Sequence, residues 1–236
     1  MSILLNISGL VIDFDTRFPD YVTKRCANYV VAEGKADLHL RATDENIRLA
    51  NRDNVGVEEA ELYAMTIPLS DEMPAMGRIM THGVAISCDN KGFIFTAESG
   101  VGKSTHAFLW QKYLGEERVH VINGDKPILW FRDGDIFACG SPWSGKEHLD
   151  ENVSVPLRGI CLLHRLGGKV DRPCIYRATK EETLDFFLHQ IFVPSNPMSK
   201  LKTLQMVEEL YDKVPVYQLY TDISKEGVMV SSKIIN

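Results

Sequence analysis

Residues 97–105 read Ala-Glu-Ser-Gly-Val-Gly-Lys-Ser-Thr, and this segment constrains the fold more than any other stretch of the chain. It matches the phosphate-binding loop pattern G-x-x-x-x-G-K-[ST] except at the first position, where Ala97 replaces glycine. Residues 92–96 are rich in aromatic and β-branched side chains, which predicts a strand, and residues 107–114 predict a largely buried helix that ends at Gly115. Strand, glycine-rich loop and helix in that order are the context in which such a loop binds phosphate.

The residue types in this loop suit a bound nucleotide. Successive backbone N–H groups would form a nest for phosphate oxygens, and the start of the following helix would add its positive dipole end. Lys103 would reach the β- and γ-phosphates, and the Ser104 hydroxyl would ligate Mg²⁺. The residues predicted to bind the cofactors, ATP and Mg²⁺, are Glu98, Ser99, Gly100, Val101, Gly102, Lys103, Ser104 and Thr105. The alternative is a tight glycine-rich turn that binds nothing.

The composition excludes several classes of protein. The 236 residues are 44% hydrophobic and 25% charged, which is ordinary for a globular protein. A net charge of −6 argues against a nucleic-acid or acidic-membrane partner. The five cysteines are scattered without a C-x-x-C pair, which favours a reducing compartment over a disulfide framework or a zinc site. We find no signal peptide and no apolar run long enough to span a membrane, so we predict a cytoplasmic protein.

The first third of the chain carries no recognisable catalytic signature. Residues 2–14 predict a hairpin or two short strands, residues 29–32 and 36–40 predict a second hairpin, and residues 47–50 predict one more strand. Residues 52–54 predict a turn and residues 58–65 a helix, after which Pro68 and Pro74 are expected to break the structure. We therefore predict a β-rich N-terminal region, residues 1–75, packed on a core of residues 76–236.

Two polar side chains flank the loop in sequence. His82 precedes a predicted strand over residues 84–86, and it can lie near the loop if that strand neighbours the strand before the loop. Asp125 follows a predicted strand over residues 119–122. A carboxylate at the C-terminal end of a strand beside such a loop usually holds Mg²⁺ or acts as a catalytic base. The alternative is that Asp125 is a solvated residue of an Asn-Gly-Asp turn.

The rest of the chain alternates strands and helices. Residues 128–131 and 136–139 predict a hairpin with an Asp-Gly turn, and residues 140–147 predict a loop of the kind that often approaches ligands. Further strands are predicted at residues 159–164, 175–177 and 216–221. Helices are predicted after the capping box at Thr179, after Asn196-Pro197 and after Ser224.

The segment from residue 82 to residue 165 resembles the HPr kinase/phosphorylase family and its compact phosphoenolpyruvate carboxykinase-like relatives, in particular short bacterial members. The resemblance lies in His82-Gly83, residues 98–104, Gly124-Asp125 and Arg158-Gly159, which match the family motifs in order and spacing. It implies an α/β fold in which a mixed sheet with flanking helices forms a P-loop catalytic domain of the HPr kinase type over residues 76–236.

The resemblance also implies roles for single residues. Asp125 matches the proton acceptor for the substrate hydroxyl, and His82 and Arg158 match residues that stabilise the transferred phosphoryl group. Two positions depart from the family pattern, because Gly124 and Pro156 replace acidic residues that contribute to metal coordination.

Metal coordination by this chain is therefore expected to be thinner than in HPr kinases. Ser104 and Asp125 remain as ligands for Mg²⁺, and we hypothesise that Glu147 supplies the missing carboxylate.

The predicted function is an ATP- and Mg²⁺-dependent kinase that transfers the γ-phosphoryl group to a hydroxyl. The acceptor is expected to be serine, on a protein or peptide or as a small molecule, and the sequence leaves the oligomeric state open, a homo-oligomer included. One alternative is decarboxylation of the phosphoenolpyruvate carboxykinase type, and another is a nucleotide-binding regulator without turnover. The first alternative requires an oxaloacetate site and a second metal, for which we find no set of residues. The losses at Gly124 and Pro156 favour the second alternative.

Overall fold

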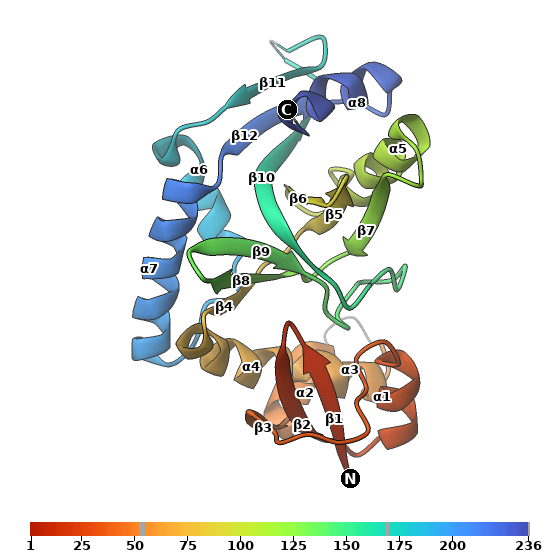
Figure 1. Cartoon of the computed structure of the whole chain (residues 1–236), viewed down its shortest axis with the longest axis vertical. Helices are drawn as coiled ribbons and strands as arrows, with labels where there is room; N and C mark the ends of the chain where they lie inside the picture. Colours follow the sequence, from red (N-terminus) through yellow and green to blue (C-terminus); the bar gives the residue numbers. More distant parts are fainter. Residues whose placement is uncertain (52–54, 169, 236) are drawn as a thin grey trace.

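The computed structural model describes residues 1–51, 55–168 and 170–235. Within these residues the strands form two sheets, one of three strands and one of nine. The small sheet and the helices of residues 19–72 lie at one end of the molecule, and the large sheet with its flanking helices makes up the rest (Figure 1). The architecture is mixed α/β, as predicted.

The small sheet contains β1 (Ser2–Ile7), β2 (Leu10–Asp15) and β3 (Leu38–Arg41). The first two strands form the predicted antiparallel hairpin, whose turn residues Ser8 and Gly9 have positive φ angles of 47° and 78°. The hairpin predicted over residues 29–40 is wrong. β3 pairs in parallel with β2, and Val30 forms only an isolated bridge with Leu5.

Helices α1 (Pro19–Arg25), α2 (Asp44–Ala50), α3 (Val57–Ala64) and α4 (Thr66–Glu72) pack around this sheet, and a 3₁₀ turn over Met73–Met76 follows. The strand predicted over residues 47–50 is wrong, because a capping box between Thr43 and Asn46 starts α2 there. Pro68 does not break the chain, since it lies in the first turn of α4, where its missing N–H removes no helical hydrogen bond.

The helix predicted over residues 58–65 is confirmed by α3. The turn predicted over residues 52–54 lies outside the described residues. The N-terminal region is therefore a mixture of helices and strands, and the prediction that it is β-rich is wrong.

The large sheet is built around one long strand. Its strands are β4 (Arg78–Met80), β5 (Val84–Cys88), β6 (Lys91–Thr96), β7 (Val119–Asn123), β8 (Ile128–Arg132), β9 (Asp135–Cys139), β10 (Ser154–Arg165), β11 (Cys174–Arg177) and β12 (Val216–Thr221). The order β4-β8-β9-β10-β6-β5-β7 mixes parallel and antiparallel pairs. β10 is long enough to pair with β9 at its start and with β6 and β12 farther along, so the sheet curls around it (Figure 1).

Helices cover both faces of this sheet. On one face α5 (Lys103–Leu114) and α8 (Lys225–Ser231) bury Trp110, Phe93 and Phe95, and on the other face α6 (Lys180–His189) and α7 (Pro197–Lys213) bury Phe187 and Leu210. The predicted caps are confirmed. Thr179 forms a capping box with Glu182, and Asn196 accepts hydrogen bonds from two backbone N–H groups of α7.

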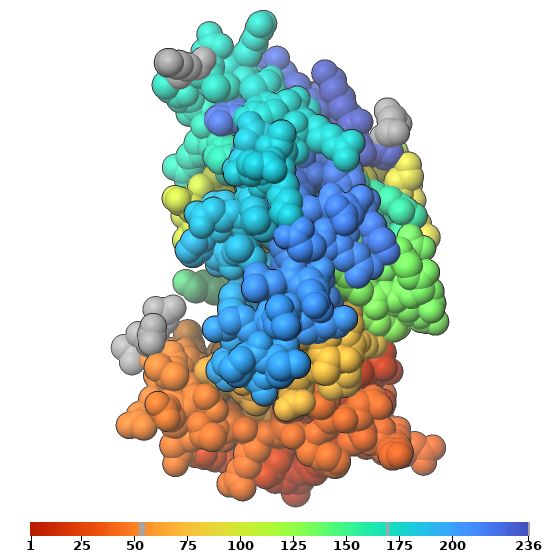
Figure 2. Space-filling model, turned by 90° about the vertical axis from the view of Figure 1, so that its left-hand side faces the viewer, coloured from red at the N-terminus to blue at the C-terminus, as the bar shows by residue number. Residues whose placement is uncertain are grey.

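The N-terminal region shares a hydrophobic core with the large sheet. One cluster of buried side chains joins Leu62, Leu69 and their neighbours to Ile128 and Trp143. A polar link reinforces it on the other side, where Asp71 of α4 accepts hydrogen bonds from the backbone N–H groups of Ser195 and Asn196, just before α7. Figure 2 shows α7 lying directly above the N-terminal helices. These contacts fix the N-terminal region against the catalytic candidates described below.

Two further observations concern the whole described chain. All five cysteines are free thiols, and the four in strands β5, β9 and β10 and near α1 are buried. Among the helices that the structure describes, none combines the length and the apolarity that a membrane span requires.

Candidate functional site

The glycine-rich loop connects β6 to α5, as the sequence predicts. Gly100 and Gly102 have φ angles of 78° and 119°, and a Cβ atom added at either would have no neighbour within 4 Å. Backbone conformation, not lack of space, is therefore what requires glycine at both positions. Gly102 directly precedes the first turn of α5, whose unpaired N–H groups face the loop. Gly115 ends the helix, also as predicted.

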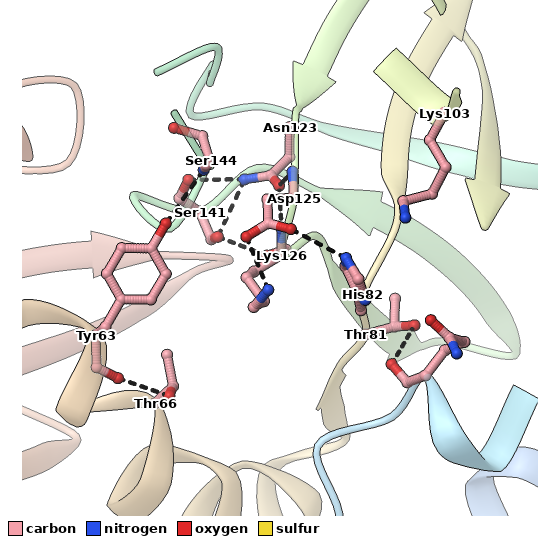
Figure 3. A network of polar contacts seen from close by, with 12 residues as sticks. Tyr63, Thr66, Thr81, His82, Lys103, Asn123, Asp125, Lys126, Ser141 and Ser144 are labelled. Atoms are coloured by element: carbon pink, nitrogen blue, oxygen red, sulfur yellow. Dashed lines mark hydrogen bonds and ion pairs between the residues drawn. The ribbon is translucent and has the colours of Figure 1, made fainter. Parts of the chain in front are cut away.

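Lys103 is folded back over its own loop. Its Nζ donates a 3.1 Å hydrogen bond to the carbonyl oxygen of Ala97, the residue that replaces the first glycine of the motif. Burial lowers the pKa of Lys103, the negative charge of Asp125 opposes that shift, and the positive charge of Lys126 adds to it. Lys103 is therefore within electrostatic reach of Asp125, and Figure 3 shows its amine on the side of Asp125 from which His82 approaches.

Asp125 is held in place by a turn. The side-chain oxygen of the fully buried Asn123 accepts hydrogen bonds from the backbone N–H groups of Asp125 (2.9 Å) and Lys126 (2.6 Å). The Asn123 amide nitrogen donates in turn to the carbonyl oxygen of Ser141 at 2.8 Å. Asn123 was not among the predicted site residues, although an Asn at the end of a strand commonly accepts hydrogen bonds from the backbone two residues on in an Asx turn.

The Asp125 carboxylate has two charged or polar partners. His82 Nε2 lies 3.2 Å from Oδ1, and Lys126 Nζ lies 2.7 Å from Oδ2. Burial alone would raise the pKa of Asp125, but the hydrogen bond from His82 and the charge of Lys126 outweigh it, so the pKa lies below its ordinary value. The carboxylate is therefore ionised at neutral pH. Lys126 is a contact that the sequence analysis missed, although it directly follows Asp125.

Strand order brings His82 and Asp125 together. β5 lies between β6 and β7 and is antiparallel to both, with Val84 opposite Phe95 and Ala85 opposite Asn123. The start of β5 therefore lies at the ends of both neighbouring strands, where the loop and Asp125 begin. The Thr96 hydroxyl also donates a 2.9 Å hydrogen bond to the carbonyl oxygen of His82.

The strand register separates Arg158 from this group. Arg158 is an exposed residue at a shift in register on β10, between Leu157, which is opposite Gly92, and Gly159, which is opposite Phe93. Gly92 lies at the beginning of β6, whereas the glycine-rich loop follows its end. The structure therefore brings together His82, Lys103 and Asp125 but not Arg158.

Glu147 and Ser104 lie at the edge of the site. A Cβ atom added at Gly145 would lie 3.1 Å from Asp125 Cβ and 3.7 Å from Glu147 Oε2, so both carboxylate-bearing side chains flank this glycine. Ser104 is the second residue of α5 and is half-buried.

These residues could supply only a few of the ligands that a metal ion needs. Within residues 1–51, 55–168 and 170–235, no three His, Cys, Asp or Glu side chains gather closely enough to hold a metal ion. Mg²⁺ in phosphate-transfer sites is commonly bound by one or two protein oxygens together with substrate phosphates and water. The Ser104 hydroxyl and the Asp125 carboxylate offer oxygens of the kind that such a site uses, although His82 and Lys126 already contact the two oxygens of the carboxylate.

Two cavities border the group. A cavity of about 410 Å³ lies against the loop residues Gly100 and Gly102 and is lined by apolar side chains of Leu109, Leu163 and Ile223. Arg165, at the end of β10, donates hydrogen bonds to the carbonyl oxygens of Gly100 and Val101 at its rim.

A second cavity, of about 640 Å³, has Asp125 and Lys126 in its wall and lies between the loop after β9 and the N-terminal region. Tyr63 of α3 contributes to that wall, and in Figure 3 Asp125 lies between Tyr63 and Lys103. The sequence analysis assigned no site residue to the N-terminal region, since nothing in residues 1–75 resembles a catalytic motif.

The chain was compared with protein families, curated sequences and solved structures. No protein-family profile matches the chain, and no curated protein sequence matches it. Among solved structures 52 chains match. One of them is the HPr(Ser) kinase/phosphatase from Coxiella burnetii, which is 8% identical, with the match covering 66% of this chain and 93% of that chain at a TM-score of 0.38.

Proposed function

We propose that this protein is an ATP- and Mg²⁺-dependent phosphotransferase that passes the γ-phosphoryl group of ATP to a hydroxyl group. One observation carries the proposal. An ionised, oriented carboxylate, Asp125, lies within electrostatic reach of the Lys103 amine of a strand–loop–helix unit and also borders an open cavity. Phosphoryl transfer needs a donor and an acceptor on opposite sides of the transferred group. Here Lys103 would bind the donor, and the cavity beside Asp125 would receive the acceptor.

The donor side belongs to the loop. The backbone N–H groups around Gly100 and Gly102 and the start of α5 would receive the phosphates, and Lys103 would leave the Ala97 carbonyl to contact the β- and γ-phosphates. The apolar cavity of about 410 Å³ beside the loop would receive the base. Ser104 and Asp125, with Glu147 nearby, would hold Mg²⁺, which neutralises phosphate charge when it is bound.

The acceptor side belongs to Asp125. The attacking hydroxyl gives its proton to the carboxylate, its oxygen forms the new bond to phosphorus, and the bond from phosphorus to the bridging oxygen breaks with its electron pair leaving on ADP. Phosphoryl transfer depends mainly on positioning and charge neutralisation, so a carboxylate of lowered pKa suffices when it is held in place. His82 supplies that hold, and Lys126 offers positive charge beside the reacting group.

We assign the charge-stabilising role that the resemblance gives to Arg158 to His82 and Lys126 instead. The reason is distance along the sheet, because Arg158 lies beside the beginning of β6 and the loop follows the end of that strand.

A nucleotide-binding regulator without turnover is the second candidate. The observation that favours it is the ion pair between Asp125 and Lys126, which occupies a carboxylate oxygen that a base or a metal ligand would need. The two candidates differ in turnover and agree on nucleotide binding.

The test measures ATP binding and ATP turnover separately on the purified full chain. We expect ATP–Mg²⁺ to bind and to be hydrolysed slowly with water as the acceptor, and Asp125→Asn to lower turnover by about 10²–10⁴-fold while binding persists. Asp133→Asn is the matched control, because Asp133 is an exposed carboxylate in the β8–β9 turn. Binding without any Asp125-dependent turnover would favour the regulator, and absence of ATP binding would overturn both candidates.

A further inference from the structure

The cavity of about 640 Å³ has walls from two parts of the chain. The N-terminal region contributes Tyr21, Ala50, Val55, Glu59 and Tyr63. Asp125 and Lys126 contribute from the turn after β7, and the loop after β9 completes the lining with Gly145 and its neighbours. Because the proposed catalytic carboxylate borders this cavity, a molecule bound there can present a hydroxyl to Asp125.

Several hydrogen bonds fasten the N-terminal wall to the catalytic turn. The Trp143 indole N–H donates to the carbonyl oxygen of Leu62 at 2.8 Å, and the Trp143 carbonyl oxygen accepts from Lys126 N–H at 3.0 Å. The Tyr63 hydroxyl accepts a 3.3 Å hydrogen bond from Gly145 N–H. Trp143 thus joins helix α3 to Lys126, the residue next to Asp125. These hydrogen bonds hold the two walls of the cavity in a fixed position.

A second tie lies on the other side of the loop. The buried side chain of Arg25, in α1, donates a 2.9 Å hydrogen bond to Ser144 Oγ and lies 3.3 Å from the carboxylate of Asp150, whose side chain is also buried. Ser144 donates to the same carboxylate at 2.5 Å. Two helices of the N-terminal region therefore hold the loop that includes Gly145.

Among the described residues of the cavity wall, Glu59 is a half-buried carboxylate that forms no ion pair with a Lys or Arg side chain. Tyr21 donates a hydrogen bond to Glu59, and among the described residues no Lys or Arg side chain forms an ion pair with Glu59. Burial raises the pKa of Glu59, and the nearby His148 opposes that shift. A carboxylate in this situation gains most from a cation that enters the cavity with it.

The other charged groups of the wall are less selective. Lys126 is already paired with Asp125, and Lys146 and His148 are exposed to solvent, where water and salt weaken their pull on a ligand. Within the part of the chain that the structure describes, Glu59 is therefore the wall carboxylate that a cation bound in the cavity would pair with. The volume of about 640 Å³ lies in the range of small-molecule sites and also admits one or two residues of a peptide.

We propose that the N-terminal region forms the acceptor pocket of this enzyme and that Glu59 selects hydroxyl-bearing acceptors that also carry an ammonium group. The proposal rests on the phosphotransferase function argued above, since it assigns the acceptor of the same site. The ammonium could belong to a free amino compound or to a lysine or N-terminus of a peptide. In both cases Glu59 would form an ion pair with the ammonium group.

The experiment compares pairs of hydroxyl acceptors, one member with and one without an ammonium group, with ATP as the donor and the full chain as the enzyme. Ethanolamine and L-serine carry an ammonium group, whereas ethylene glycol and N-acetyl-L-serine do not. We expect wild type to prefer the ammonium member of each pair, and Glu59→Gln to reduce that preference in kcat/KM by about tenfold or more through KM. Glu58→Gln is the matched control, because Glu58 is an exposed neighbour on the same helix.

A second readout does not depend on turnover. Binding of ethanolamine, followed by ligand-observed NMR, should be weakened by Glu59→Gln and unchanged by Glu58→Gln. A short peptide with adjacent lysine and serine, compared with free L-serine, separates a peptide acceptor from a small molecule. Equal use of both members of each pair by wild type, or identical wild-type and Glu59→Gln behaviour, would overturn the acceptor proposal. Loss of ATP hydrolysis in water would instead overturn the phosphotransferase proposal.

Discussion

The indole N–H of Trp143 donates a 2.8 Å hydrogen bond to the main-chain carbonyl oxygen of Leu62, and Trp143 itself is 2% exposed. Leu62 belongs to α3, and Trp143 precedes the glycine that flanks Asp125. The two residues are far apart in sequence but join the N-terminal region to the candidate catalytic turn. This contact holds the N-terminal region against the loop that flanks the candidate site.

The same hydrogen bond gives a stability prediction. Trp143→Phe keeps an aromatic ring in the core but removes the indole donor, so that the Leu62 carbonyl keeps only its 3.3 Å hydrogen bond from the Met65 N–H. We expect this loss of one hydrogen bond to lower the free energy of unfolding by about 0.5–1.5 kcal/mol. Urea denaturation followed by circular dichroism measures it. A decrease in the free energy of unfolding below about 0.5 kcal/mol, the usual size for a surface substitution, would show that this hydrogen bond does not stabilise the fold.

Lys103 is predicted to increase the affinity for ATP. Lys103→Met removes a cation that would contact the β- and γ-phosphates, and hydrogen bonds to charged groups are worth about 1.5–3 kcal/mol, so ATP affinity should fall by about 10–100-fold. Isothermal titration calorimetry checks this. Lys112→Met, an exposed lysine later on the same helix, should leave affinity unchanged. Equal losses in both variants would point to a general charge effect.

His82 is predicted to set the pH dependence of turnover. Its hydrogen bond helps to hold the pKa of Asp125 below the ordinary value, so His82→Asn should raise that pKa. A base must be deprotonated to act, and the acid limb of the kcat/KM profile should therefore move to higher pH. The exposed His120 on β7 offers the control, since His120→Asn should not move the profile. An unshifted limb in His82→Asn would contradict the role given to this contact.

Glu147 gives a test of the sparse metal site. If it contributes to Mg²⁺ binding beside Asp125, then Glu147→Ala should raise the Mg²⁺ concentration needed for half-maximal turnover several-fold and leave ATP affinity at saturating Mg²⁺ unchanged. Steady-state rates over a Mg²⁺ series measure it. Glu116→Ala alters an exposed carboxylate away from the loop and serves as the comparison. Unchanged Mg²⁺ dependence and rate in Glu147→Ala would remove Glu147 from the site.

Because His106 is buried, we predict that the free energy of unfolding falls in mild acid. It is 2% exposed on α5, its Nε2 lies 2.9 Å from Ser231 Oγ, and burial lowers its pKa from 6.5 to about 4. Between these values the unfolded chain binds a proton that the folded protein does not, so stability rises with pH and falls as pH drops through this window. The shift corresponds to about 3 kcal/mol.

Urea denaturation at pH 7, 6, 5 and 4.5 measures this dependence. Wild type should lose stability over the series, and His106→Gln should lose less of it, whereas His120→Gln should follow wild type because His120 is exposed. Parallel curves for wild type and His106→Gln would contradict the assignment.

Local signals in the sequence predicted many elements correctly. The glycine-rich loop, the Asp133-Gly134 turn and the caps at Thr179 and Asn196 each depend on backbone conformation or hydrogen bonds within about four residues. Residues 47–50 show where a local reading failed. A short apolar run fits a strand or a helix, and the capping box at Thr43 decided for the helix.

By itself the sequence determined a strand, a glycine-rich loop and a helix, with Lys103 and Ser104 at the start of that helix and Asp125 after a later strand. Only the tertiary structure decided that β5 lies between β6 and β7, which brings His82 to Asp125 and leaves Arg158 at the far end of β6. It also placed Glu59 and Tyr63 in the wall beside Asp125. The physical reason is range, because caps and turns are set by neighbouring residues, whereas strand order and the packing of distant segments are set by burial of the whole chain.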